Sequence, residues 1–338
     1  MDFPLPGTRL VAEQSPPGPA ERPQARVHVA GNSAVDVLVR TPAGLPEEAA
    51  DTWGANTLLL DDPIEVTLGG CGAAPAWVLG RLGNSVSLNS NIGGDGPGSL
   101  AASWLSGAGV SLVPSDPPPK ATAVHVVQLD AAGRRRSAYF PGEKVEWLRS
   151  AGEAADWLLA SGYGGVEGGD VDSLQELFTG ARARGARLVF DPSPWFAGRV
   201  SAEQMLCLWR LIDGLVATEE ELGNWLPAGS PEALAEAALE AGPRWVVVKR
   251  GSLGARFASR AWESGTVAAV PVEGRNSVGA GDTLNGRLVH GLSRGESLAE
   301  AVAAAVELAT NTVRNGRGVL GAFDGLQARE TAGDSQNQ

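Results

Sequence analysis

A carboxylate next to a run of small residues is the most informative chemical feature of this sequence. Gly279, Ala280 and Gly281 precede Asp282, and residues 284–292 continue with the apolar spacing of a helix. Small residues let backbone N–H groups approach an anion closely, and the start of a helix adds partial positive charge. A carboxylate there would be repelled by the anion, so its natural role is to take a proton from an attacking hydroxyl. The pattern predicts phosphoryl transfer, with a tight turn and a capped helix as the alternative.

Four further segments carry glycines or acidic residues in short motifs. They are residues 69–83 (GGCGAAPAWVLGRLG), 92–98 (IGGDGPG), 189–193 (VFDPS) and 246–255 (VVVKRGSLGA). In this order, and followed by residues 276–286 (NSVGAGDTLNG), they resemble the signature segments of the ribokinase-like (PfkB) carbohydrate kinases over roughly residues 26–325. One such motif has a real false-positive rate, whereas five in order are specific.

The resemblance implies a role for each residue of the turn. It implies that Asp282 is the catalytic base, and that the backbone amides of Gly279, Ala280 and Gly281 form the anion hole for the transferred phosphoryl group. It also implies that ATP is the phosphate donor, that Mg²⁺ is the metal, and that a sugar or a nucleoside is the acceptor.

On the acceptor side, Asp36 is the main candidate. A carboxylate is a good acceptor for two neighbouring hydroxyls, and in the family the aspartate of a comparable G-x-x-x-x-D opening bonds the sugar. The alternative is a strand residue that faces solvent, although the neighbours Val35 and Val37 have the character of buried residues. The substrate-binding set implied by the resemblance consists of Asn32, Asp36, Gly69 and Gly70.

On the nucleotide side, the resemblance implies contacts from Lys249, Gly251, Gly254 and Thr218. Lys249 ends an expected strand, where its ammonium group could reach the phosphates as a point charge. The alternative is that Lys249 is a solvent-exposed residue at the end of the strand, with no role in nucleotide binding. Glu221 matches a family glutamate that organises Mg²⁺ through water, and an acidic first helical turn is the alternative.

Three positions depart from the family pattern. Asn276 stands where many relatives have an aspartate that supports a monovalent cation, so we expect a weak cation site and little activation by potassium. Ala74 replaces an asparagine that contacts the substrate, and Thr218 replaces an asparagine of the metal network. We therefore expect the acceptor to be recognised differently than in ribokinases.

Composition and charge exclude several classes of function. The 338 residues are 43% hydrophobic and 20% charged, and the net charge of −12 argues against nucleic acid as a partner. No apolar run is long enough to span a membrane, and the N-terminal residues lack the features of a signal peptide. Cys71 and Cys207 lie far apart and have no metal-ligand spacing. These features predict a cytoplasmic protein.

Few residues outside the motifs suggest a function. The basic cluster at residues 134–136 is expected at a solvated hairpin turn. The three histidines, His28, His125 and His290, show no ligand spacing, so we expect ordinary strand and helix residues.

Short β-rich segments alternate with segments of helical period, which predicts a mainly parallel sheet with helices on both faces. The expected strands are residues 26–31, 85–90, 123–129, 187–191, 213–217 and 244–249. The expected helices are residues 73–82, 97–107, 172–184, 202–210, 232–241, 281–293 and 297–313. A further strand is expected to end near Val272. Asp36, the Gly69–Gly70 pair, Asp191, Lys249 and the 276–282 turn are then expected after strands, on one rim of the sheet.

Two regions interrupt the alternation, residues 37–68 and a hairpin within 121–140. The resemblance implies that they form a small β-sheet lid on a ribokinase-like three-layer α/β/α domain. We expect this domain to cover residues 26–327, between a flexible N-terminal extension (1–25) and a flexible tail (328–338). An exposed edge of the lid would allow a homodimer.

The leading hypothesis is an ATP- and Mg²⁺-dependent kinase that phosphorylates a hydroxyl, preferably a primary one, of a sugar or sugar-like molecule. A nucleoside kinase is the alternative within the family. A non-catalytic sugar- or nucleotide-binding regulator is the alternative from another class, and the intact Asp282 argues against it. Residues 93–98 lack the G-x-G-x-x-G spacing of a Rossmann dehydrogenase.

Overall fold

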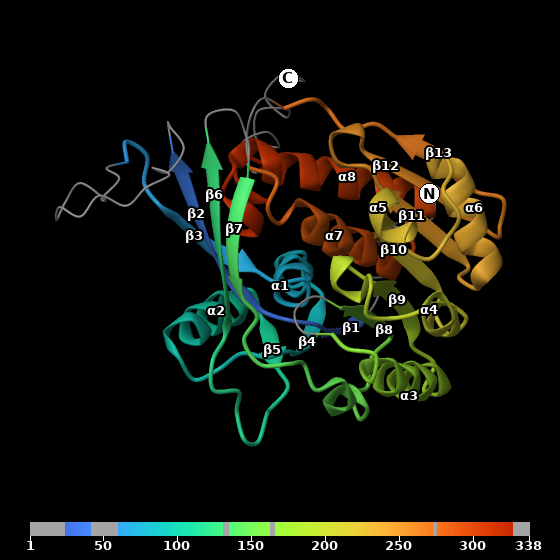
Figure 1. The fold of residues 1–338 in the computed structure, drawn as a ribbon, viewed down its shortest axis with the longest axis horizontal. Coiled ribbons are helices and arrows are strands. Elements are labelled where there is room, and N and C mark those ends of the chain that lie inside the picture. Colours follow the sequence, from blue (N-terminus) through green and yellow to red (C-terminus); the bar gives the residue numbers. More distant parts are fainter. Residues whose placement is uncertain (1–23, 42–59, 131–134, 163–165, 273–275, 327–338) are drawn as a thin grey trace, which may run out of the picture.

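A large, mostly parallel sheet forms the centre of the molecule (Figure 1). The structure is a computed structural model that describes residues 24–41, 60–130, 135–162, 166–272 and 276–326. Within these ranges the sheet has nine strands in the order β13-β12-β11-β10-β9-β8-β1-β4-β5. The strands are β1 (Arg26–Ala30), β4 (Ser85–Asn89), β5 (Val110–Leu112), β8 (Trp157–Ser161), β9 (Arg187–Asp191), β10 (Gly214–Thr218), β11 (Trp245–Lys249), β12 (Ala255–Ser259) and β13 (Ser264–Val267). Only the pairs β11–β12 and β12–β13 are antiparallel.

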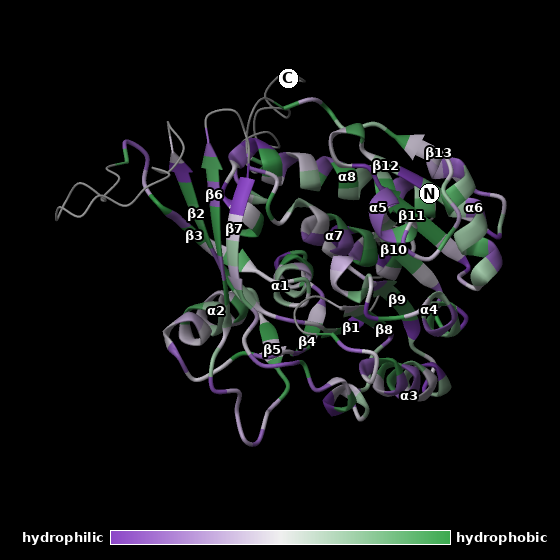
Figure 2. Cartoon of the chain, in the orientation of Figure 1, coloured by the Kyte–Doolittle hydropathy of each residue, from purple (hydrophilic) through white to green (hydrophobic). Residues whose placement is uncertain are grey.

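Helices cover both faces of this sheet and form two separate cores. On one face lie α1 (Ala73–Arg81), α2 (Gly96–Gly107), α7 (Ala280–Arg294) and α8 (Leu298–Asn315). On the other lie α3 (Asp170–Ala183), α4 (Ala202–Trp209), α5 (Glu219–Leu222) and α6 (Pro231–Ala241). Successive strand residues pack into opposite cores, as Leu158 and Leu159 of β8 do. Strands covered on both faces are therefore coloured mainly as hydrophobic in Figure 2, whereas the helices carry both colours.

A second, smaller sheet stands at one side of the large one (Figure 1). Its order is β3-β2-β6-β7, with β2 and β6 parallel and both outer pairs antiparallel. The strands are β2 (Ala34–Thr41), β3 (Glu65–Gly69), β6 (Ala123–Asp130) and β7 (Arg135–Phe140). Leu38 and Val127 pack on Val278, so one face of this sheet covers the loop that leads into α7. The small sheet is therefore placed to close a site at the start of that helix.

Short 3-10 turns complete the chain. They are η1 (Trp147–Ser150), η2 (Pro194–Phe196), η3 (Gly251–Leu253) and η4 (Gly318–Gly321). Among the described residues, no helix combines the length and the apolar character needed to cross a membrane.

The predicted fold class is confirmed, and the expected strands and helices lie within a few residues of the observed ones. β5, β8, β12 and β13 were missed. The strand expected to end near Val272 is wrong, because the ladder between β12 and β13 stops at the Ala255–Val267 pair and Pro271 has no N–H to donate. Asp36 lies inside β2 and not after a strand. Most of the extension (1–25) and all of the tail (328–338) lie outside the described residues.

Candidate active site

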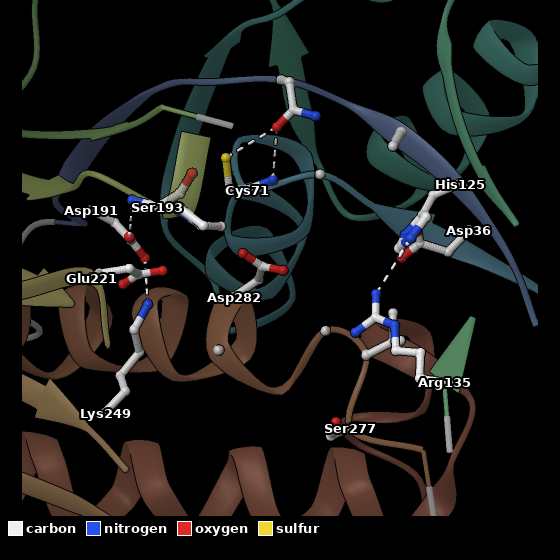
Figure 3. A pocket seen from close by; sticks show the side chains of 17 residues that line it. Asp36, Cys71, His125, Arg135, Asp191, Ser193, Glu221, Lys249, Ser277 and Asp282 are labelled. Atoms are coloured by element: carbon white, nitrogen blue, oxygen red, sulfur yellow. Dashed lines mark hydrogen bonds and ion pairs between the residues drawn. The ribbon is translucent and has the colours of Figure 1, made fainter. Parts of the chain in front are cut away.

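A cavity of about 310 Å³ lies between the small sheet and the start of α7 (Figure 3). Its lining comes from distant parts of the chain: the β1–β2 loop, β2 with Asp36, the turn before α1, β6, β7, the end of β9 with the residues that follow it, α5, the end of β11, and the loop into α7 with the first turn of that helix. Asp191 and Lys249 end parallel strands of the large sheet, where ligands bind in such folds.

Asp282 stands in the first turn of α7, and its carboxyl group faces this cavity (Figure 3). Gly279 caps the helix with a φ of 81°, and a Cβ there would lie 2.9 Å from the backbone nitrogen of Val319. Glycine is therefore required at this position. Gly279 and Gly281 line the cavity, whereas the N–H of Ala280 already donates to the carbonyl of Ser277. The turn can present backbone donors and the positive end of α7 to an anion.

Burial raises the pKa of Asp282 to about 7. The ammonium group of Lys249 opposes this shift, while the neighbouring carboxylates Asp191, Asp36 and Glu221 add to it. A carboxyl group with a pKa near neutrality can accept a proton at physiological pH and is well matched to general-base chemistry.

A buried polar network lies beside Asp282. Lys249 Nζ donates to Asp191 Oδ2 at 2.7 Å, and Asn285 Nδ2 of α7 donates to the same oxygen at 2.6 Å. Asp191 Oδ1 accepts the N–H of Ser193 at 3.0 Å. Because Asp191 and Glu221 flank its ammonium group, the pKa of Lys249 is raised despite the cost of burial. The network fixes a cation next to the anion-binding turn, since Nζ lies 3.9 Å from where a Cβ on Gly281 would stand.

Glu221 is a buried acid within this group, 7% exposed, and burial raises its pKa. It forms a reciprocal cap with Thr218: its Oε2 accepts the N–H of Thr218 at 2.7 Å, and its own N–H donates to the threonine hydroxyl at 3.1 Å. The cap holds the carboxyl group at the cavity wall. The described residues contain no cluster of three or more side chains arranged to hold a metal ion.

The opposite wall carries residues of the small sheet. Asp36 of β2 is directly paired with His125 of β6, and Asp36 Oδ1 lies 3.5 Å from His125 Nδ1. A Cβ on Gly69 would lie 2.3–2.4 Å from the Asp36 carboxyl atoms, so this glycine leaves the space that the carboxylate occupies. Arg135 of β7 extends over the cavity toward His125 (Figure 3).

Asn32 organises the turn that precedes α1. Its Oδ1 accepts the N–H of Cys71 at 3.1 Å and the thiol at 3.0 Å, and its Nδ2 donates to the hydroxyl of Tyr139 at 3.0 Å. Gly70 has a φ of 86°, and a Cβ there would lie 2.5 Å from the carbonyl oxygen of Asn32. Side chain and glycines together keep this wall of the cavity open and polar.

A second cavity of about 480 Å³ adjoins the first, and Ser277 lines both. Gly251, Gly254 and Ala280 form part of its wall, and the rest is mostly apolar. The apolar lining comes from residues 269–272, Leu284, Val306, Ala309 and Val313. This arrangement, a polar cavity joined to an apolar one at a helix start, suits a polar acceptor and the planar base of a nucleotide.

The structure brings most of the predicted site residues together. The first cavity contains Asn32, Asp36, Gly70, Glu221, Lys249, Gly279, Gly281 and Asp282, and the second contains Gly251, Gly254 and Ala280. Gly69, Thr218 and Asn276 line neither cavity. Asn276 is buried, and its Oδ1 accepts the N–H of Val278 at 3.0 Å.

Two basic residues of the cavity, His125 and Arg135, were expected to have no role in the site. His125 is no ordinary strand residue, because it faces Asp36, and Arg135 lies in β7 and not in a hairpin turn. The hairpin tip, including Arg134, lies outside the described residues. Both residues fall on the face of their strands that Leu38 and Val127 mark as inward, so period-two spacing could have indicated that they point inward, but not which residues they meet.

Comparison with solved structures shows the same fold. A ribokinase from Cryptococcus neoformans var. grubii serotype A in complex with ADP has a TM-score of 0.69 at 22% identity, covering 92% of this chain and 100% of that one. A putative ribokinase II from E. coli has a TM-score of 0.70 at 22% identity, covering 91% and 98%. Arabidopsis thaliana ribokinase with ribose and ATP has a TM-score of 0.65 at 18% identity, covering 88% and 95%.

No curated protein matches the chain in sequence. Residues 35–319 match the pfkB family of carbohydrate kinases, and this range includes Asp36 and Asp282. The chain therefore belongs to the pfkB carbohydrate kinase family.

Proposed function

We propose that this protein transfers the γ-phosphoryl group of ATP to a hydroxyl, preferably a primary one, of a sugar or sugar-like acceptor. One observation carries the proposal: Asp282, with a pKa near 7, stands at the start of α7 where the polar and the apolar cavity meet. Membership of a carbohydrate kinase family supports the same chemistry.

In the proposed reaction the acceptor lies in the first cavity, with two of its hydroxyls bonded to Asp36. Asp282 takes the proton of the reacting hydroxyl as the oxygen forms a bond to the γ-phosphorus. The bond between that phosphorus and the β–γ bridging oxygen breaks, and ADP leaves with the electron pair. The turn at residues 279–281 and the ammonium group of Lys249 stabilise the negative charge on the transferred group.

The second cavity would hold the nucleotide base, with Gly251 and Gly254 at the phosphate side. For Mg²⁺ the chain offers Glu221, whose buried carboxyl group lines the first cavity next to Asp191. Mg²⁺ keeps several waters and is usually bound through one or two carboxylates plus substrate phosphates, so a single glutamate acting through water fits such a site. When bound, the metal would neutralise phosphate charge.

Two other functions are supported by particular observations. A nucleoside kinase would use the same catalytic base and anion-binding turn, and only the part of the cavity that contacts the acceptor would differ. A non-catalytic binding protein is suggested by Ala74, Thr218 and Asn276, which depart from the family pattern. We favour the enzyme because a binding protein has no need for a buried carboxylate of raised pKa beside the anion-binding turn.

We also propose a homodimer formed through the outer face of the small sheet. Ile64, Val66, Val126 and Phe140 are exposed there, between 38% and 53%. Exposed apolar residues on a sheet of this size suit a protein–protein contact. Since ATP is the donor, we place the enzyme in the cytoplasm.

An ATP-consumption screen tests the proposed function. Purified protein is incubated with Mg²⁺-ATP and panels of sugars, sugar acids and nucleosides, and the Asp282→Asn variant serves as the matched control. We expect ADP formation that depends on one acceptor class and is lost in the variant. Acceptor binding without ADP formation would instead support the binding protein.

A further inference from the structure

Arg135 is a cation that the proposed chemistry leaves without a role. It lies in β7, lines the first cavity, and directs its guanidinium group toward His125 and Asp36 (Figure 3). Its Nη2 lies 3.4 Å from Nε2 of His125, whose Nδ1 lies 3.5 Å from Asp36. Among the described residues, no carboxylate lies within ion-pair distance of Arg135.

Lys249, the other strongly basic residue that lines this cavity, is already paired with a carboxylate. Lys249 donates to Asp191 and stands beside the turn at Gly281, on the side of the transferred phosphoryl group. Arg135 belongs to the opposite wall, with Asp36 and His125, where the acceptor would bind. The two cations therefore face two different ends of the cavity.

We infer that the acceptor carries an anionic group, a carboxylate or a phosphate, that the guanidinium group of Arg135 binds. A guanidinium group offers paired N–H donors that match the oxygens of either anion. Asp36 would bond hydroxyls of the same molecule, and the hydroxyl at its other end would reach Asp282. The inference rests on the proposed function, since it names the acceptor class of the same site.

The strand supplies a matched control. Arg136 is the next residue of β7, and neighbouring strand residues point to opposite faces of a sheet. Arg136 does not line the cavity. Arg135→Gln and Arg136→Gln therefore remove the same charge from the same strand, one inside the cavity and one outside.

The experiment measures acceptor binding by calorimetry without ATP, and kcat/KM with it. The probes are five- and six-carbon aldoses, the corresponding aldonic acids and the corresponding terminal phosphates. We expect at least one anionic series to bind more tightly than its neutral partners, and Arg135→Gln to weaken that binding about tenfold or more. Arg136→Gln should change it less than about twofold. The preferred series distinguishes carboxylate from phosphate.

Two results would overturn the inference. One is that neutral aldoses bind as tightly as both anionic series in every matched set. The other is that Arg135→Gln lowers kcat equally for all acceptors with no change in their binding, which would assign Arg135 to the transferred phosphoryl group. Failure of the proposed function looks different: anionic acceptors would bind through Arg135, but no ADP would form.

Discussion

Lys249 should set the pH at which this enzyme becomes active. Its ammonium group lies 2.7 Å from Asp191 and lowers the pKa of Asp282, which burial has raised to about 7. Replacing it by methionine keeps the length of the side chain and removes the charge. Asp282 must be deprotonated to accept a proton, so activity falls as the pH drops below its pKa. Removal of the cation should therefore move this fall in activity, the acid limb of the pH profile, to higher pH.

The magnitude follows from Coulomb's law. In general, a unit charge about 6 Å from an ionisable group contributes about 3 kcal/mol at an effective dielectric constant of about 20, which corresponds to about two pKa units. Asp191 also raises the pKa of Asp282, but this repulsion is present in both proteins and does not change the difference between them. We expect the acid limb to rise by about one to two units from its starting value near 7.

The assay is kcat against pH at saturating ATP and acceptor, for the wild type, Lys249→Met and a control. Lys144→Met is the control, since Lys144 forms an exposed ion pair with Glu167 away from the cavity. The control should reproduce the wild-type profile. An acid limb that stays in place in Lys249→Met, with kcat still measurable, would refute the electrostatic coupling of Lys249 to the base.

Two further predictions concern the ligands. Asp36→Ala should weaken acceptor binding by about 1.5–3 kcal/mol for each lost hydroxyl contact and leave ATP binding nearly unchanged; calorimetric titration with both ligands checks this, and equal losses would place Asp36 outside the acceptor pocket. Potassium should activate weakly or not at all, because Asn276 supplies no charge to hold the cation. The measurement is kcat in K⁺ and in a bulky organic cation at matched ionic strength, and saturable activation well above about tenfold would contradict it.

The sequence predicted the parts of the site that depend on local chain geometry. The Gly279–Asp282 turn needs only small residues and a helix start, and Asp191 and Lys249 end strands of mainly apolar character. These patterns are visible in a few consecutive residues, so their position and type could be predicted before the structure.

What escaped prediction depends on pairing between distant segments. His125 meets Asp36 only because β2 and β6 are parallel neighbours in a particular register, and Arg135 reaches them only through the pairing of β7 with β6. Nothing near these residues in the sequence specifies that register. The role of Gly69 was also hidden, since it makes room for a side chain thirty-three positions earlier in the chain, that of Asp36.

The most direct test of the account is turnover and nucleotide binding in Asp282→Asn. The amide keeps the shape of the carboxyl group and cannot accept the hydroxyl proton. We predict a loss of about 10²–10⁴ in kcat, with ATP affinity close to that of the wild type. A variant that keeps more than about a tenth of the wild-type kcat would contradict the assignment of Asp282 as the base.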